Sequence, residues 1–199
     1  MPRKTMARKF LDLTFTPSVI EAQLQFGHGQ GQRLAENKAF RELELEDDTL
    51  SGAEAEFIQA RDSFYLATVN EDGWPYVQHR GGPTGFLKVI DGKTLAYADF
   101  RGNQQMLSMG NLQVNNRASL FFMDYANQRR LKILAHSEYV DAREATGTTA
   151  ELLKSVTDAD YPAHIERIVL FHVVAYDWNC PQHITPRYTQ SEWRAANAH

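Results

Sequence analysis

The middle of the chain alternates hydrophobic and polar residues in short runs, a pattern typical of half-buried β-strands. We predict strands over residues 64–69, 76–80, 86–90, 94–99, 120–123, 131–134 and 168–176. Turn pairs such as Asp72-Gly73 and Asp91-Gly92 separate neighbouring strands. Because a curled sheet leaves fewer exposed strand edges than a flat one, these short strands predict a mainly β protein built as a barrel.

Helical signals are few and lie mostly outside this region. Thr16-Pro17 pairs a capping residue with a proline at the first helical position, and Ser51 with Glu54 has the spacing of a capping box. Further short helices are predicted over residues 104–109 and 150–156. The glycine-rich stretch 27–32, which contains His28, is predicted to be a mobile loop or an arm, and the acidic stretch 42–48 is predicted to be solvated. We therefore expect residues 1–50 to form a helix and a mobile arm packed on a barrel domain of residues 51–199.

Composition excludes several classes of protein. The 199 residues fit one decorated domain, and the net charge of −4 argues against nucleic-acid binding. No apolar run approaches the roughly 20 residues of a membrane span, and the basic start lacks the apolar core of a secretory signal. A single cysteine cannot form an intrachain disulfide, which fits a cytoplasmic protein.

That cysteine, Cys180, stands three residues before His183, a spacing that could begin a metal site. A tetrahedral site needs two more ligands, and no second such pair occurs in the sequence. A Cys–His nucleophilic pair would need an orienting residue, and none is identifiable. We therefore expect no metal.

The turn Arg80-Gly81-Gly82-Pro83 is the first candidate binding motif. Glycines let backbone N–H groups approach a ligand closely, and an arginine adds charge and a fork of donors. The same residues also suit a sharp turn between two strands. Either interpretation fits the sequence.

A second motif, Asp99 to Gln105, leads from a predicted strand into a predicted helix. Free N–H groups at a helix start bind phosphate, and Asn and Gln side chains add neutral donors. Alternatively, Asn103 simply caps the helix.

A third motif, Arg129 to Lys132, alternates basic and apolar residues along a strand. Residues 130 and 132 therefore share one face, opposite 129 and 131. That basic face could meet an anionic ligand or be a solvated edge that discourages aggregation.

Together these blocks resemble the pyridoxamine 5′-phosphate oxidase-like FMN-binding split-barrel family, in particular its flavin-nucleotide-binding branch. The resemblance covers roughly residues 54–188 and is carried by residues 80–83, 99–103, 110–112 and 178–183. It implies a six-stranded antiparallel split β-barrel with flanking helices. It also implies a homodimer that holds FMN at the subunit interface.

The resemblance assigns roles by segment. Residues 78–85 would line the flavin ring and ribityl chain, residues 103–105 would read the phosphate, and Arg130 would face the cofactor. Residues 178–183 would approach the flavin after the last strand, from either the same subunit or its partner. The cofactor-binding residues implied are Gln78, His79, Arg80, Gly81, Gly82, Asp99, Asn103, Gln104, Gln105, Arg130, Trp178, Gln182 and His183.

The implied function is that of an FMN-binding flavoprotein, an oxidoreductase acting on an unknown small molecule. The alternatives are a non-catalytic FMN carrier or sensor and a flavin-free interaction protein. Gln104 and Gln105 stand where the family often has basic residues, so Arg101 or a more distant arginine must supply the charge that meets a phosphate. The arginine and histidine pattern of the vitamin B6 oxidase C-terminus is not evident, which argues against pyridoxamine phosphate oxidation. No catalytic acid or base can be named.

Overall fold

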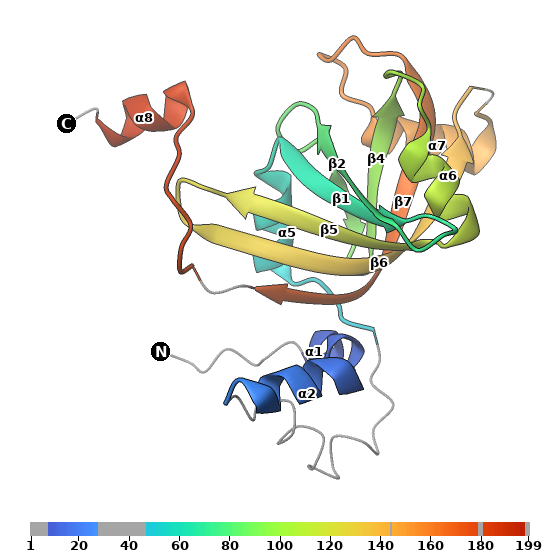
Figure 1. Ribbon diagram of the computed structural model, residues 1–199. Coiled ribbons are helices and arrows are strands. Elements are labelled where there is room, and N and C mark those ends of the chain that lie inside the picture. Colours follow the sequence, from blue (N-terminus) through green and yellow to red (C-terminus); the bar gives the residue numbers. More distant parts are fainter. Residues whose placement is uncertain (1–7, 28–46, 144, 179–180, 198–199) are drawn as a thin grey trace.

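The computed structural model describes residues 8–27, 47–143, 145–178 and 181–197. Its strands are β1 (Ser63–Val69), β2 (Pro75–Gly81), β3 (Lys88–Asp91), β4 (Thr94–Phe100), β5 (Arg117–Asp124), β6 (Arg129–Asp141) and β7 (Ile165–Trp178). Its helices are α1 (Arg8–Thr14), α2 (Pro17–Gln25), α5 (Gly52–Gln59), α6 (Leu107–Val114), α7 (Gly147–Val156) and α8 (Gln190–Ala196). Figure 1 shows the curled sheet with α1 and α2 below it and α8 standing apart at the end of an extended segment.

All neighbouring strands in the described sheet are antiparallel, in the order β2-β1-β5-β6-β7-β4-β3. The mainly β, antiparallel fold with flanking helices is therefore confirmed. The resemblance implied six strands, whereas the described sheet has seven, as the seven runs of the sequence predicted, with the short strand β3 on the free side of β4. The edge strands β2 and β3 do not pair with each other, so the barrel is split on this side.

Alternation along the strands builds the core. In β1, Phe64 and Leu66 are buried and Tyr65 points outward; in β6, Leu131 and Ile133 are buried. Phe64 lies at the centre of an aromatic cluster. Its ring centroid lies 5.4–6.3 Å from those of Phe86, Tyr97, Phe122 and Phe171.

The capping box predicted at α5 is present and also anchors the last strand. The backbone N–H of Ser51 donates to Glu54 Oε2 at 3.0 Å, and the indole N–H of Trp178 donates to Glu54 Oε1 at 2.6 Å. Burial raises the pKa of Glu54, but the hydrogen bonds from the Ser51 side chain, Trp178 and the Ser51 backbone outweigh it, so the pKa lies below its ordinary value. Glu54 therefore stays ionised at neutral pH and holds α5 to the end of β7.

Several predicted boundaries are corrected. The helix placed at residues 104–109 begins only at Leu107, because Gln104 and Met106 adopt left-handed φ angles of 58° and 56°. The strand placed at 86–90 begins at Lys88, because Phe86 and Leu87 turn inward as core residues. Strands β6 and β7 extend well past the predicted runs. The loop with His28 and the cysteine Cys180 lie outside the described residues, as does most of the acidic stretch 42–48.

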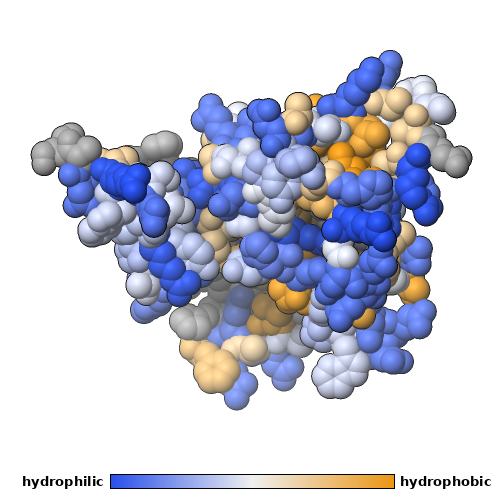
Figure 2. All heavy atoms as spheres, turned by 90° about the horizontal axis from the view of Figure 1, so that it is seen from above, coloured by the Kyte–Doolittle hydropathy of each residue, from blue (hydrophilic) through white to orange (hydrophobic). Residues whose placement is uncertain are grey.

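Seen from above, the surface is mostly hydrophilic, with hydrophobic side chains in separate groups (Figure 2). Within the described ranges, no helix is long and apolar enough to cross a membrane.

Candidate functional site

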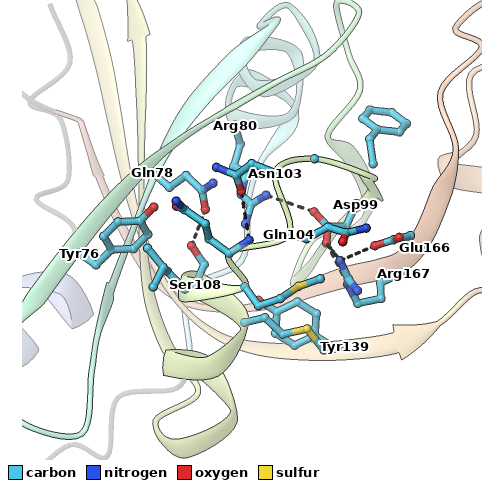
Figure 3. A pocket seen from close by; sticks show the side chains of 16 residues that line it. Tyr76, Gln78, Arg80, Asp99, Asn103, Gln104, Ser108, Tyr139, Glu166 and Arg167 are labelled. Carbon is cyan, nitrogen blue, oxygen red and sulfur yellow. Dashed lines mark hydrogen bonds and ion pairs between the residues drawn. The ribbon is translucent and has the colours of Figure 1, made fainter.

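A cavity of about 280 Å³ lies at the split of the barrel, between β2, the loop that joins β4 to α6, and the start of β7 (Figure 3). Its lining residues are Tyr76, Gln78, Arg80, Asp99, Phe100, Gly102, Asn103, Gln104, Gln105, Met106, Leu107, Ser108, Met109, Tyr139, Glu166 and Arg167.

Strand β2 supplies one wall through every second residue. Tyr76, Gln78 and Arg80 share one face because side chains alternate along a strand. Gln78 is tied to α6, since the Ser108 hydroxyl donates to Gln78 Oε1 at 2.7 Å. A second tie joins α6 to β1, where the Asn111 amide donates to Thr68 Oγ1 at 2.9 Å. These bonds fix the helix against the open edge of the sheet.

A row of alternating charges crosses the split. Arg80 Nη1 on β2 lies 3.1 Å from Asp99 Oδ1 on β4, and Arg167 Nη2 on β7 lies 2.9 Å from Asp99 Oδ2. Arg167 Nη2 also lies 3.1 Å from Glu166 Oε2. Figure 3 shows these groups in sequence along one wall. Asp99 is buried and each of its carboxylate oxygens accepts from an arginine, so it braces the two arginines.

The buried Tyr97 and the half-buried Tyr139 stand beside this row. Burial raises the pKa of Tyr139 to about 12 and raises that of Tyr97 further, so both phenols are neutral at physiological pH. Among the residues that the structure describes, neither hydroxyl has a hydrogen-bond partner, and neither does Arg80 Nε. Buried polar groups normally have partners. Because Tyr139 and Arg80 line the cavity, its wall is suited to a ligand rich in acceptor oxygens.

Residues 102–106 of the loop between β4 and α6 form a further part of the wall. The N-cap of α6 is Met106, which provides no side-chain cap, so Asn103 does not cap this helix. Instead, Asn103 Oδ1 accepts from the backbone N–H of Gln105 at 3.2 Å. Among the described residues, the start of α6 thus has no side-chain cap, and Leu107 and Ser108 place it beside the cavity. A helix start of this kind favours an anion.

The structure brings together six of the residues implied by the resemblance: Gln78, Arg80, Asp99, Asn103, Gln104 and Gln105. His79 and Gly81 belong to the opposite face of β2, because they alternate with Gln78 and Arg80. Gly82 serves packing, since a Cβ there would lie 2.8 Å from Phe86 Cβ, and its N–H donates to Asp62 O at 2.9 Å. Gly81 thus ends strand β2, where it pairs with Ser63, and Gly82 follows the strand, whereas Arg80 reaches the cavity.

The remaining implied residues lie away from the cavity in this chain. Arg130 pairs in register with Met123, on the face of β6 opposite the core residue Leu131. Trp178 binds Glu54 and lies beneath the guanidinium of Arg129, at 4.7 Å from the ring centroid. Gln182 and His183 are exposed in the segment after β7.

Sequence reasoning missed Tyr76, Ser108, Tyr139, Glu166 and Arg167. Strand alternation could have selected Tyr76, which stands two residues before Gln78. Glu166, Arg167 and Tyr139 reach the cavity only through the pairing of β4 with β7 and of β7 with β6, in which Asp99 faces Arg167 and Tyr139 faces Val169. Pairing between distant strands leaves no local signal in the sequence.

A second cavity, of about 430 Å³, lies between the start of β1, the turn from β5 to β6 and the segment before α8. Tyr65, Tyr125 and Arg187 are among the residues that line it. None of the residues that the resemblance implies as cofactor-binding lines this second cavity. Within the described ranges, no group of His, Cys, Asp or Glu residues could hold a metal ion.

Comparison with known proteins shows which family the chain matches. The sequence model of the pyridoxamine 5′-phosphate oxidase family matches residues 50–174, more than half of the chain. No curated protein matches the chain.

Several solved structures are similar to this chain. HupZ from Group A Streptococcus is 14% identical with a TM-score of 0.47, over 70% of this chain and 100% of that one. A candidate pyridoxamine 5′-phosphate oxidase from Lactobacillus delbrueckii is 18% identical with a TM-score of 0.49, over 66% and 98%. An FMN-binding protein from Syntrophomonas wolfei is 14% identical with a TM-score of 0.43, over 63% and 86%.

Proposed function

The chain belongs to the pyridoxamine 5′-phosphate oxidase family, and from that premise we propose that it is an FMN-binding flavoprotein, a cytoplasmic oxidoreductase acting on a small molecule. The observation that carries the proposal is the cavity at the split of the barrel. It combines buried donors that have no partner within the described chain, Arg80 Nε and Tyr139 Oη, with a helix start that has no side-chain cap.

The cavity residues fit FMN in their chemistry. A flavin ring offers carbonyl oxygens and ring nitrogens, which the amide of Gln78 and the phenol of Tyr139 can meet as neutral partners. A terminal phosphate suits the start of α6 and the amides of Asn103 and Gln105. Ligand pockets usually enclose about 300–1,000 Å³, so a cavity of about 280 Å³ holds part of a flavin nucleotide and leaves the rest to another surface.

When bound, FMN supplies the redox chemistry by accepting and releasing a hydride or electrons. The protein's own contribution is binding and orientation. The Gln78–Ser108 hydrogen bond and the brace of Arg80, Asp99 and Arg167 fix the wall before the ligand arrives. Tyr139 keeps its proton at neutral pH, because its pKa is raised to about 12, and so remains a hydrogen-bond donor.

We propose that a second copy of the chain packs on the outward face of β1 and β2, the side of β2 opposite the cavity. The outward faces of β1 and β2 carry exposed hydrophobic residues: Tyr65 (39% exposed), Val69 (37%) and Val77 (60%). A sheet face that meets only water is normally polar, so these residues point to a partner.

The implied residues His79 and Arg130 share this outward face. Tyr65 pairs with both His79 and Phe121, and Met123, two residues beyond Phe121, pairs with Arg130. Helix α1 covers the other end of the face, where the ring of Phe10 lies 4.5 Å from Lys132 Nζ. A homodimer formed through the uncovered end would bury His79 and Arg130 between the subunits.

A non-catalytic FMN carrier or sensor is the second candidate. The lining residues include neither histidine nor cysteine, and the lining acids Asp99 and Glu166 are both paired with Arg167. No group in the described wall is thus an evident proton donor or acceptor for a substrate.

The absorption spectrum of the purified protein, followed by addition of NADH or NADPH, tests the proposal. A yellow protein that bleaches rapidly supports an oxidoreductase. A yellow protein that is not reduced supports the carrier. A protein that stays colourless after addition of FMN contradicts both.

A further inference from the structure

Within the described ranges, the second cavity, of about 430 Å³, shares no lining residue with the cavity at the split. It lies where the extended segment before α8 passes the turn between β5 and β6 (Figure 1). Gln128 in that turn fixes the segment, because its Nε2 donates to Ile184 O at 2.6 Å and the Ile184 side chain is buried. The cavity is of the size that small-molecule sites have, about 300–1,000 Å³.

Arg61, one of the two arginines in the wall of this cavity, serves the fold. Its Nε donates to Phe57 O at 3.3 Å and its Nη1 to Met123 O at 3.4 Å. Its Nη2 lies 3.5 Å from Asp124 Oδ2, and Asp124 is buried. Drawing Arg61 away would leave a buried carboxylate without its cation, which is costly. Arg61 is therefore committed to the protein rather than to a ligand.

Arg187, the other arginine in the wall, is held in place but not paired. Its guanidinium carbon lies 4.9 Å from the ring centroid of Tyr125, a cation–π contact. Among the residues that the structure describes, Arg187 has no hydrogen-bond or ion-pair partner. The two acids of the wall have partners close by in the chain: Asp62 accepts from the Ser63 hydroxyl at 2.9 Å, and Glu192 belongs to the capping box of α8. The donor fork of Arg187 is thus left for a ligand.

Aromatic side chains form much of the remaining wall. Tyr65 on β1, Tyr125 after β5 and Tyr188 before α8 all line the cavity, together with the apolar side chain of Met123. The neighbouring Tyr125 raises the pKa of the Tyr65 phenol above its ordinary value, so Tyr65 is neutral at physiological pH and does not repel an anion. Such rings offer flat apolar surfaces against which another ring can pack.

We propose that the second cavity binds a planar aromatic carboxylate. The carboxylate accepts two hydrogen bonds from the fork of Arg187, and the aromatic part packs against Tyr65 and Tyr125. Arginine and carboxylate often pair in this bidentate way, through hydrogen bonds roughly twice as strong as neutral ones. The site is separate from the flavin cavity and does not depend on the proposed function.

Isothermal titration calorimetry with 2-naphthoate and 2-naphthamide tests this site, because the amide has nearly the same shape but no charge. The wild type is expected to bind 2-naphthoate saturably and 2-naphthamide at least about 10-fold less tightly. Arg187→Gln should weaken 2-naphthoate binding about 10- to 100-fold and leave 2-naphthamide within about threefold. Arg187→Lys keeps the charge without the planar fork and should recover part of the affinity.

Arg194→Gln is the matched control for the arginine variants. Arg194 is an exposed arginine of α8 that does not line the cavity, so both affinities should stay at the wild-type level. Tyr125→Leu removes the ring beneath Arg187 and should weaken the binding of both ligands. Circular dichroism of each variant ensures that a loss of affinity is not a loss of fold.

Saturation with FMN shows which cavity is occupied. Because the two cavities share no lining residue in the described ranges, FMN should leave the affinity for 2-naphthoate unchanged. Competition between the two would place 2-naphthoate at the split and overturn the second site. A wild type that does not bind 2-naphthoate, or an Arg187→Gln variant that binds it as tightly as the wild type, would also overturn it. A protein that binds 2-naphthoate through Arg187 but binds no flavin contradicts the proposed function alone.

Discussion

Replacing Asp99 by alanine is expected to lower the free energy of unfolding by about 3 kcal/mol, because it leaves two guanidinium groups without their shared partner. Asp99 Oδ1 binds Arg80 and Asp99 Oδ2 binds Arg167, and both arginine side chains are mostly buried. The substitution also removes the ion pair that joins β2 to β4 across the split. In the described sheet, β2 and β4 are not neighbouring strands, so strand pairing does not hold them together. Urea unfolding followed by circular dichroism measures the loss.

Asp141→Ala is the control for this experiment. Asp141 forms an ion pair with Arg143 that resembles the Asp99 pairs in chemistry but is exposed to solvent. Exposed pairs contribute little, so the control should unfold at nearly the wild-type urea concentration. Equal destabilisation by the two substitutions would show that the buried row of charges does not hold the split together.

Replacing Val77 by aspartate is expected to weaken dimerisation by at least about 100-fold. Val77 is 60% exposed at the centre of the hydrophobic face of β1 and β2 and pairs in register with Ala67. In a two-fold symmetric interface, each substitution appears twice, so two unpaired carboxylates would be buried together. Sedimentation velocity over a range of protein concentrations measures the change.

Ile90→Asp is the matched control for Val77→Asp. Ile90 is also an exposed β-branched residue, 41% exposed, but it lies on β3 at the opposite edge of the sheet. It should leave the dimer intact. A wild-type protein that sediments as a monomer, or a Val77→Asp variant that remains dimeric, would remove this face from the proposed interface.

The sequence predicted the strands well because their signal is local. Alternation along residues 64–69 and 131–134 is enough to assign both the strand and its buried side. The same rule, applied to β2, separates Gln78 and Arg80 from His79 and Gly81. Treating residues 78–82 as one contiguous motif obscured that separation, because neighbouring residues on a strand face opposite ways.

The rest of the site depends on interactions that a linear pattern does not contain. Arg167 and Tyr139 reach the cavity through the pairing of distant strands, and both lie beyond the hydrophobic runs that marked β7 and β6. The late start of α6 follows from left-handed conformations at Gln104 and Met106, which non-glycine residues seldom adopt. The approach of Arg101 to Glu166 likewise follows from the contact between the loop and the start of β7.

Equilibrium titration of the wild-type apoprotein with FMN, with riboflavin as the comparison, tests the central claim most directly. The account predicts saturable binding of one FMN per chain and riboflavin binding weaker by at least about 10-fold, because the start of α6 and its loop recognise the phosphate. Equal affinity for the two flavins would contradict the phosphate site, and absence of binding would contradict the assignment of the cavity to a flavin.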